Sequence, residues 1–406
     1  MPLDHTIRMV LLFGITLAVS LALTPVVRRL ALRRGLVDLP GEARRVHKVA
    51  VPRLGGLAMY AAFAIGVLLT FMFGVQANQV GNGIFEGARI LFMLAGAGII
   101  TVVMAVDDVK KLRPLPRLLW QVGAALLVVL PSLFWPGGPN PLLTGGMEPP
   151  GTLHYDQGAG VIATSIRNPI GGMTIELPLI LAVLFTVFWI TGVTNAINWI
   201  DGLDGLAAGV SVVACAVLFI ITGPILGQYT LAYLPLLLGA ATLGFLPYNI
   251  YPARIFMGDS GAMFLGFTLA VLSVIGGAKL ASALLVLGIP LLDAVYIIIN
   301  RVSRGRSPMS ADRSHLHHRL LDIGLRPQQV VIIFYLLCGT FGVLAFLLTS
   351  TASEINMLGL RLSPSLFKLF ALIVLGMVLV SLLIFISRRR FDQGSGIRDQ
   401  GSETRS

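Results

Sequence analysis

Residues 178–206 read PLILAVLFTVFWITGVTNAINWIDGLDGL, an apolar run that ends in amides and carboxylates. The apolar part is close to the about 20 residues with which a helix crosses the hydrocarbon of a bilayer. Asn195, Asn198 and Asp201 follow at a spacing of three, which places them on one face of a helix. Ionisable side chains at a membrane edge are retained where they are paired, hydrated or functional. The stretch therefore predicts a transmembrane helix that carries a polar site at its end.

The rest of the chain repeats the apolar part of this pattern. Hydrophobic residues make up 56% of the 406 residues and charged residues only 12%, and the mean hydropathy is +0.86, values that exclude an ordinary soluble domain. Cys215 and Cys338 each lie inside an apolar stretch, which favours buried thiols over a disulfide or a metal site. We expect an all-α polytopic membrane protein with about eleven transmembrane helices, at 7–27, 54–74, 88–106, 117–135, 178–196, 206–223, 230–247, 260–277, 280–300, 328–349 and 366–387.

The distribution of basic residues predicts the orientation of these spans. With the N-terminus outside, 24 of the 30 Lys and Arg residues fall in cytoplasmic loops or in the C-terminal tail, and six fall outside. Positive charge is enriched on the cytoplasmic side of membrane proteins, so we expect the N-terminus outside and the C-terminus in the cytoplasm. The net charge of +11 then reflects loops that face anionic lipid, and no nucleic-acid partner is expected.

We expect a single integral-membrane domain over residues 1–390. Its long external loop, 136–177, is rich in Gly and Pro, and the segment 152–166 within it could form a small hairpin. The tail 391–406 is polar and is expected to be a disordered cytoplasmic segment. The N-terminal apolar run has no basic leader and no A-x-A cleavage site, which predicts a retained first span.

Three acidic motifs fall on the cytoplasmic side in this topology. Asp107-Asp108 ends the third expected span, Asp201 and Asp204 lie in NAINWIDGLDGL, and Asp259 lies in FMGDSG at the start of a helix. Each motif alone also fits a capped helix end, and Asp107-Asp108 alone fits equally well an ordinary boundary that the following lysines neutralise. Together, carboxylates on one face favour a metal-dependent site, because they suit Mg²⁺ held against a phosphate.

A histidine cluster lies on the same side. The sequence SHLHHRL carries His315, His317 and His318 among arginines that include Arg313. Imidazoles beside arginines suit phosphate binding better than zinc, because no cysteine accompanies them; a hydrated basic loop is the alternative. Asp293 lies inside the ninth expected span, where it is either a buried structural acid or part of the site.

The order DD…NAINWIDGLDG…PYNIYPARIFMGDSG…DRSHLHHRL resembles the polyprenyl-phosphate N-acetylhexosamine-1-phosphate transferases of glycosyltransferase family 4, in particular their bacterial WecA/TagO-like branch. The likeness extends from about residue 36 to about residue 325. It implies a catalytic domain that transfers the sugar 1-phosphate of a UDP-N-acetylhexosamine, by default UDP-GlcNAc, to undecaprenyl phosphate and releases UMP. The implied cofactor is Mg²⁺, with Mn²⁺ as the alternative ion. The reaction would start teichoic acid, lipopolysaccharide or related polymers at the cytoplasmic face of a bacterial plasma membrane.

The resemblance also implies residue roles. Asp259 would be the principal Mg²⁺ ligand, with Asn198 beside it and Asp201 near the metal and the pyrophosphate. Asp107 would be the favoured base, next to Asp108 at the acceptor phosphate; a two-step route through an aspartyl intermediate is the alternative. The residues implied in donor binding are Lys48, Gly202, Asp204, Asn249 and Phe256 around the uridine, and Arg313, His315, His317 and His318 at the diphosphate or the sugar.

Two features separate this chain from parts of the family. Where the branch usually carries a lysine, ten residues after the first aspartate, this chain has Arg117, which keeps the charge but not the shape or the titratable amine. The histidine motif reads HLHH, whereas the related phospho-MurNAc-pentapeptide translocases have three consecutive histidines, so the motif argues against the pentapeptide donor. The resemblance also allows a homodimer, although no span carries an obvious interface.

A secondary transporter and a membrane scaffold are the rival classes. A transporter places its ionisable groups near the bilayer midplane, where only Asp293 is expected here. A scaffold that gathers soluble enzymes would not need three acidic motifs on one face. Lipid-linked product would support the transferase, and isotope flux into vesicles would support the transporter.

Overall fold

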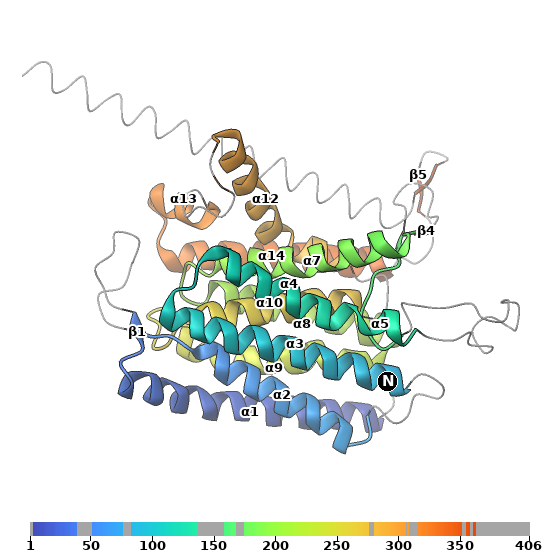
Figure 1. The fold of residues 1–406 in the computed structure, drawn as a ribbon, viewed down its shortest axis with the longest axis horizontal. Helices are drawn as coiled ribbons and strands as arrows, with labels where there is room; N and C mark the ends of the chain where they lie inside the picture. Colours follow the sequence, from blue (N-terminus) through green and yellow to red (C-terminus); the bar gives the residue numbers. More distant parts are fainter. Residues whose placement is uncertain are drawn as a thin grey trace, which may run out of the picture.

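The computed structural model describes residues 3–38, 51–75, 83–136, 158–167, 174–275, 280–305, 307, 315–350, 355–357 and 360–362. Helices dominate this part of the chain, and Figure 1 shows the long ones side by side in one bundle. The helices are α1 (Leu3–Arg33), α2 (Gly55–Met72), α3 (Gly83–Lys110), α4 (Pro114–Val129), α5 (Pro131–Phe134), α7 (Leu179–Ile200), α8 (Leu206–Ile220) with the π-helical turn η2 (Ile221–Ile225), α9 (Tyr229–Asn249), α10 (Gly258–Val274), α11 (Leu280–Val286), α12 (Gly288–Ser303), α13 (Leu316–Asp322) and α14 (Pro327–Ser350).

Three short antiparallel strand pairs accompany the bundle. They are β1 (Val37–Asp38) with β2 (Val51–Pro52), β3 (Ser165–Arg167) with β4 (Thr174–Glu176), and β5 (Ile355–Met357) with β6 (Leu360–Leu362). None of them forms a larger sheet within the described residues. The expected all-α polytopic class is therefore confirmed.

Within the described residues, eight helices are long and apolar enough to cross a membrane, and a bent pair makes a ninth span if it counts as one. The helix α10 matches the expected span 260–277 but is shorter, and the expected span 366–387 lies outside the described residues. The number eleven and the orientation stay predictions.

The span expected at 280–300 is bent in the structure. The structure has two helices there, α11 and α12, which meet at Leu287 with a bend of 77°. Pro290 lies in the first turn of α12, where a missing N–H is tolerated, but its ring prevents one helix from running through the junction. In consequence α12 projects away from the other helices, as Figure 1 shows.

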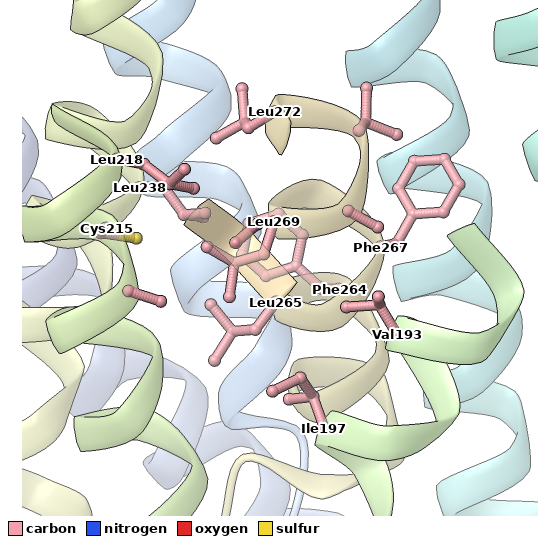
Figure 2. Packing of buried hydrophobic residues seen from close by; sticks show 14 of the residues in the cluster. Val193, Ile197, Cys215, Leu218, Leu238, Phe264, Leu265, Phe267, Leu269 and Leu272 are labelled. Carbon is pink, nitrogen blue, oxygen red and sulfur yellow. The ribbon is translucent and has the colours of Figure 1, made fainter. Parts of the chain in front are cut away.

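The helix α10 lies at the centre of the bundle. From Ser260 to Val274 every one of its side chains is buried, which is typical of a helix that is apolar all round. Figure 2 shows Phe264, Leu265 and Phe267 of α10 among side chains that include Val193 and Ile197 of α7. This packing fixes α10 and therefore the position of its first turn, which carries Asp259.

The first turn of α10 packs closely against the start of α2. Gly55 N donates to Phe256 O and Gly56 N donates to Met257 O, both at 3.0 Å. A Cβ on Gly56 would overlap the backbone of Gly261, so the two helices approach as closely as they do because glycine is present. The first residues of α2 are thereby tied to the loop before α10.

The far end of the bundle departs from the expected loop structure. The hairpin expected at 152–166 is wrong in its position, because β3 pairs with β4 further along the chain. Residues 158–163 are instead buried in an irregular segment. Val161 N donates to Val128 O, Ala163 N donates to the Thr186 hydroxyl, and Arg89 Nε donates to Gly158 O. These bonds satisfy backbone groups that a buried loop would otherwise leave unpaired.

Candidate active site

Arg117, at the start of α4, connects two of the acidic motifs. Its Nε lies 3.2 Å from Asp107 Oδ2, and its terminal nitrogen lies 2.7 Å from Asp259 Oδ2. Asp107 is buried at the end of α3 and also accepts a hydrogen bond from Leu112 N through Oδ1. The side chain of Asp259 is 33% exposed, so a ligand can reach it from solvent.

Asn198 and Asp108 support Asp259 from two other helices. Asn198, near the end of α7, donates from its amide to Asp259 Oδ1 at 3.0 Å. The carboxylate of Asp108 accepts hydrogen bonds from the backbone N–H groups of Asp259 and Ser260. An anion at this position satisfies unpaired donors of a helix N-terminus and interacts favourably with the helix dipole. Asp108 therefore holds the first turn of α10 against the last turn of α3.

Asp201 lies where α7 ends, beside these carboxylates. The pKa of its carboxyl group is raised to about 8, first by burial and then by the negative charges of Asp259 and Asp108, while Arg53 opposes the shift. After burial, the neighbouring carboxylates contribute to the raised pKa, so negative charges gather at this end of the bundle. The shift also brings Arg53, which precedes α2, into the electrostatic environment of the site.

Asp204 and Asn249 brace a loop. Asp204 Oδ2 accepts from Ala253 N, while Asn249 accepts from Gly205 N and donates to Ile255 O. Both side chains are buried. They shape the loop between α9 and α10, and their expected contact with uridine stays a prediction.

Phe256 lies in the same loop and is half-buried. Its N–H donates to Pro52 O, so the chain before α2 fixes the backbone of this residue. Its carbonyl also accepts from Gly55 N, so two backbone hydrogen bonds fix the residue that carries the ring. A ring on a fixed backbone suits stacking against a base. Its expected role toward the uridine is likewise untested.

The histidines lie around the start of α13. The ring of His315 is stacked against that of His317 at 5.6 Å between centroids, and the rings of His317 and His318 are 4.3 Å apart. His317 is buried next to Gly202, where a Cβ would overlap its ring. Glycine at this place therefore lets α13 approach the loop after α7.

His317 is neutral in this environment. Burial lowers its pKa well below the ordinary value, and the neighbouring His318 and His315 lower it further. Neither of its ring nitrogens has a hydrogen-bond partner among the residues that the structure describes. A buried imidazole of this kind can accept or donate one hydrogen bond to an incoming polar group without carrying charge.

Three residues around the site, Gln121, Trp199 and Arg301, were not singled out from the sequence. Gln121 exchanges amide hydrogen bonds with Asn195, one turn deeper than Arg117 and Asn198. Trp199 lies under the guanidinium of Arg301, which is 5.5 Å from the ring centroid. The available signal for Gln121 was its position four residues after Arg117, which places both on one face of α4. Nothing in the sequence indicates that Trp199 and Arg301 meet.

The structure brings together most of the expected site residues. Asp107, Asp259, Arg117 and Asn198 form one bonded group, Asp108 supports it, and Asp201 interacts with it electrostatically. The histidine helix, meaning α13 together with its N-cap residue His315, touches Gly202 next to Asp201. Lys48 and Arg313 lie outside the described residues.

Fold and cluster together define the class of protein: an all-α, multi-spanning membrane protein with carboxylates, an arginine and histidines at one end of its bundle. Residues 90–277 match the model of a family described as glycosyl transferase family 4. The chain is 33% identical over 385 residues to the probable undecaprenyl-phosphate N-acetylglucosaminyl 1-phosphate transferase of Bacillus subtilis (strain 168), with 91% of each chain covered.

Two further relatives show the breadth of the likeness. The decaprenyl-phosphate N-acetylglucosaminephosphotransferase of Mycolicibacterium smegmatis is 33% identical over 371 residues, covering 85% of this chain and 82% of the relative. The phospho-N-acetylmuramoyl-pentapeptide-transferase of Staphylococcus aureus is 27% identical over 334 residues, covering 79% and 92%. The chain belongs to glycosyl transferase family 4, which confirms the family resemblance found in its motifs.

Proposed function

We propose that the protein transfers GlcNAc-1-phosphate from UDP-GlcNAc to undecaprenyl phosphate and releases UMP. The observation that carries the proposal is the bonded group of Asp259, Asp107, Arg117 and Asn198, which three separate motifs build at one end of the bundle. Phosphoryl transfer depends on positioning and on charge stabilisation more than on covalent help from the protein. The names of the most similar relatives support the same acceptor class and sugar.

The donor set fits Mg²⁺ bound together with a substrate. Among the described residues, no three His, Cys, Asp or Glu side chains gather closely enough to hold a metal by themselves. Mg²⁺ commonly uses one or two carboxylates and completes its shell with phosphate oxygens and water. Asp259 and Asn198 offer adjacent oxygens, and the charge excess seen at Asp201 would be offset by a dication. When bound, Mg²⁺ or Mn²⁺ would polarise the phosphate oxygens and neutralise developing charge.

The chain's own residues would divide the remaining work. Arg117 neutralises Asp107 and Asp259 and presents further donors to a phosphate. Asp107 retains free lone pairs and would accept a proton from the acceptor phosphate. His317, which is neutral, and His318 would face the diphosphate or the sugar. Phe256, Asp204, Asn249 and Gly202 would frame the uridine, with Lys48 and Arg313 contributing charge.

The proposal includes a location. The basic residues favour the cytoplasmic face of a bacterial plasma membrane as the site of reaction, where the nucleotide sugar and the lipid phosphate can meet. The product would be the first lipid-linked sugar of a wall or surface polysaccharide. A homodimer within the membrane is compatible with this arrangement.

A transfer assay on purified protein tests the proposal. It contains undecaprenyl phosphate, Mg²⁺ and one of several donors (UDP-GlcNAc, UDP-GalNAc or UDP-MurNAc-pentapeptide), and it scores UMP release together with label in the lipid phase. We expect release with UDP-GlcNAc, matched by lipid label and stopped by EDTA. Turnover with the pentapeptide donor alone would place the protein in the translocase branch.

No transfer with any donor from folded protein and intact lipid would overturn the enzymatic proposal. Isotope flux into vesicles would then favour a transporter. The structure supplies one argument against that class, because Asp293 is bonded to His315 of the histidine helix and is not isolated in the bundle.

A further inference from the structure

The projecting helix α12 buries two charged residues on one face. Asp293 is 3% exposed and Arg301, two turns later, is 4% exposed. Side chains this inaccessible do not reach a substrate in solution. Buried charges are costly unless they are paired, so each must have a partner that accounts for its retention.

The partners of Asp293 both belong to the histidine helix. Oδ1 accepts from Leu316 N at 2.9 Å, and Oδ2 lies 3.0 Å from His315 Nδ1. Because an ionised carboxylate can only accept, Nδ1 of His315 must carry the hydrogen. This selects one tautomer of the neutral ring and directs Nε2, with its lone pair, away from α12.

Arg301 contacts Trp199, which in turn contacts His315. Its guanidinium lies 5.5 Å from the centroid of Trp199, and Trp199 meets the ring of His315 edge-on at 6.1 Å. Trp199 follows Asn198 directly in the acidic motif. One face of α12 is therefore linked to α13 through Asp293 and to α7 through Arg301, and His315 touches both links.

We propose that Asp293 is a positioning residue, which fixes the ring of His315 and the start of α13 and thereby places His317 and His318 opposite the acidic motifs. This rests on the proposed function, since the histidines act there on the donor. Removing the partner that orients a metal-bound histidine typically costs about 10–100-fold in activity, and we expect a loss of the same order for His315. If Asp293 only capped α13, asparagine would serve equally well, because its amide oxygen can still accept from Leu316 N.

The first test does not depend on activity. Histidine ¹⁵N spectra of the detergent-solubilised protein identify His315 by the signals that disappear in His315→Asn, or in His315→Gln if the former does not fold. We expect an Nδ1–H tautomer for His315 in the wild type and its loss in Asp293→Asn. A wild-type His315 that is protonated on Nε2 alone would overturn the proposal, whatever the enzyme transfers.

The second test is a double-mutant cycle on the transfer reaction. We expect Asp293→Asn to lower kcat by about 10–100-fold with little change in the KM for the donor, and Asp293→Glu to recover part of the loss. In the His315→Asn background, Asp293→Asn should have no more than about a twofold further effect, because it acts through the same ring. Independent, multiplicative losses would contradict the proposal.

The matched control is Tyr296→Phe. Tyr296 also lies on α12 and also contacts α13, since its hydroxyl accepts from Arg319 at 3.0 Å and its ring lies under the Arg319 guanidinium, whereas His315 is bonded to Asp293. We expect this variant to keep kcat within about twofold and His315 to keep its tautomer. An equal loss in Tyr296→Phe would show that any loosening of α13 is sufficient, and the specific role of Asp293 would be lost.

Discussion

Two adjacent aspartates of one motif do different things in this protein. Asp107 pairs with Arg117, whereas Asp108 caps α10, because neighbouring residues on a helix project about 100° apart. The role implied for both at the acceptor phosphate fits the geometry of Asp107 better. Loss of activity on replacing Asp108 would report first on the placement of α10.

At Asp259, removal of the charge should stop turnover while the protein stays folded. Asp259→Asn keeps the shape but gives Arg117 a neutral partner and weakens any bound cation. We expect turnover to fall by at least about a hundredfold at saturating Mg²⁺. The control is Glu176→Gln on β4, an exposed acid at the other end of the bundle, which should leave turnover unchanged. Near-wild-type activity of Asp259→Asn would remove its metal role.

Arg117 can be tested against the lysine that the family usually has. Arginine bridges Asp107 and Asp259 through two different nitrogens, which a single ammonium cannot reproduce. We expect Arg117→Lys to retain activity within about tenfold and Arg117→Gln to lose about a hundredfold, because only the latter leaves the carboxylates without a cation. Steady-state transfer rates measure both. Equal activity of wild type and Arg117→Gln would show that the bridge is dispensable.

The low pKa of His317 predicts a pH effect on stability. In the unfolded state, His317 takes up a proton near its ordinary pKa of 6.5, whereas in the folded state it stays neutral to lower pH. The contribution of His317 to the free energy of unfolding is therefore fully present above pH 6.5 and is lost as the pH falls below it. We expect a loss of up to about 1.4 kcal/mol per pH unit below it. Thermal unfolding in detergent, compared between about pH 7.5 and about pH 5.5, measures the change.

The matching variant for this experiment is His317→Asn. Its stability should fall less with decreasing pH than that of the wild type. The comparison is needed because the raised pKa of Asp201 acts in the opposite direction, favouring the folded state as pH falls below about 8. Identical pH slopes for the two proteins would contradict a buried, neutral His317.

At the scale of elements, the contact between α2 and α10 positions Asp259. Gly56→Ala should push the two helices apart, because its Cβ would overlap the backbone of Gly261. We expect a loss of roughly 1–3 kcal/mol in stability together with a loss of transfer activity. Gly123→Ala on α4 is the matched control, since nothing lies within 4 Å of its added Cβ. It should be neutral or stabilising by up to about 1 kcal/mol, and equal melting temperatures for the two variants would contradict the contact.

The bend between α11 and α12 is the other element that shapes the site. A straight helix over 280–300 would keep its residues within the bundle, whereas the 77° bend carries α12 away from it and still turns Asp293 toward α13. The bend thus makes room for a separate histidine helix beside the acidic motifs. It also explains why an acid inside an apolar span can be retained.

At the scale of the whole molecule, the orientation of the bundle can be measured. Cys215 and Cys338 are buried, so an introduced cysteine should be the principal reactive thiol among the described residues. We expect Lys111→Cys, at the site end, to react with an impermeant maleimide only after the membrane is opened, and Glu176→Cys to react in intact cells. The reverse pattern would invert the topology and place the site outside.

The sequence was sufficient for the class of the fold and for several residues that lie together in the candidate site, whose functional roles stay predictions. Apolar runs and basic loops are local signals, and the motif residues Asp259, Asn198 and Asp107 did meet. Contacts between helices could not be predicted from such local signals. The cap that Asp108 provides, and the pairing of Asp293 with His315, depend on the crossing of helices distant in the chain. Their residue types alone fit several partners equally well.

The buried segment 158–163 has a practical consequence for reagents against this protein. Its backbone is bonded to α4, to Trp135 after α5 and to α7, so a peptide of that sequence presents an epitope that the native molecule conceals. Antibodies raised against it should stain the denatured band on a blot and ignore intact cells. The neighbouring exposed strand around Ile175 and Glu176 is the better immunogen for recognising the folded protein.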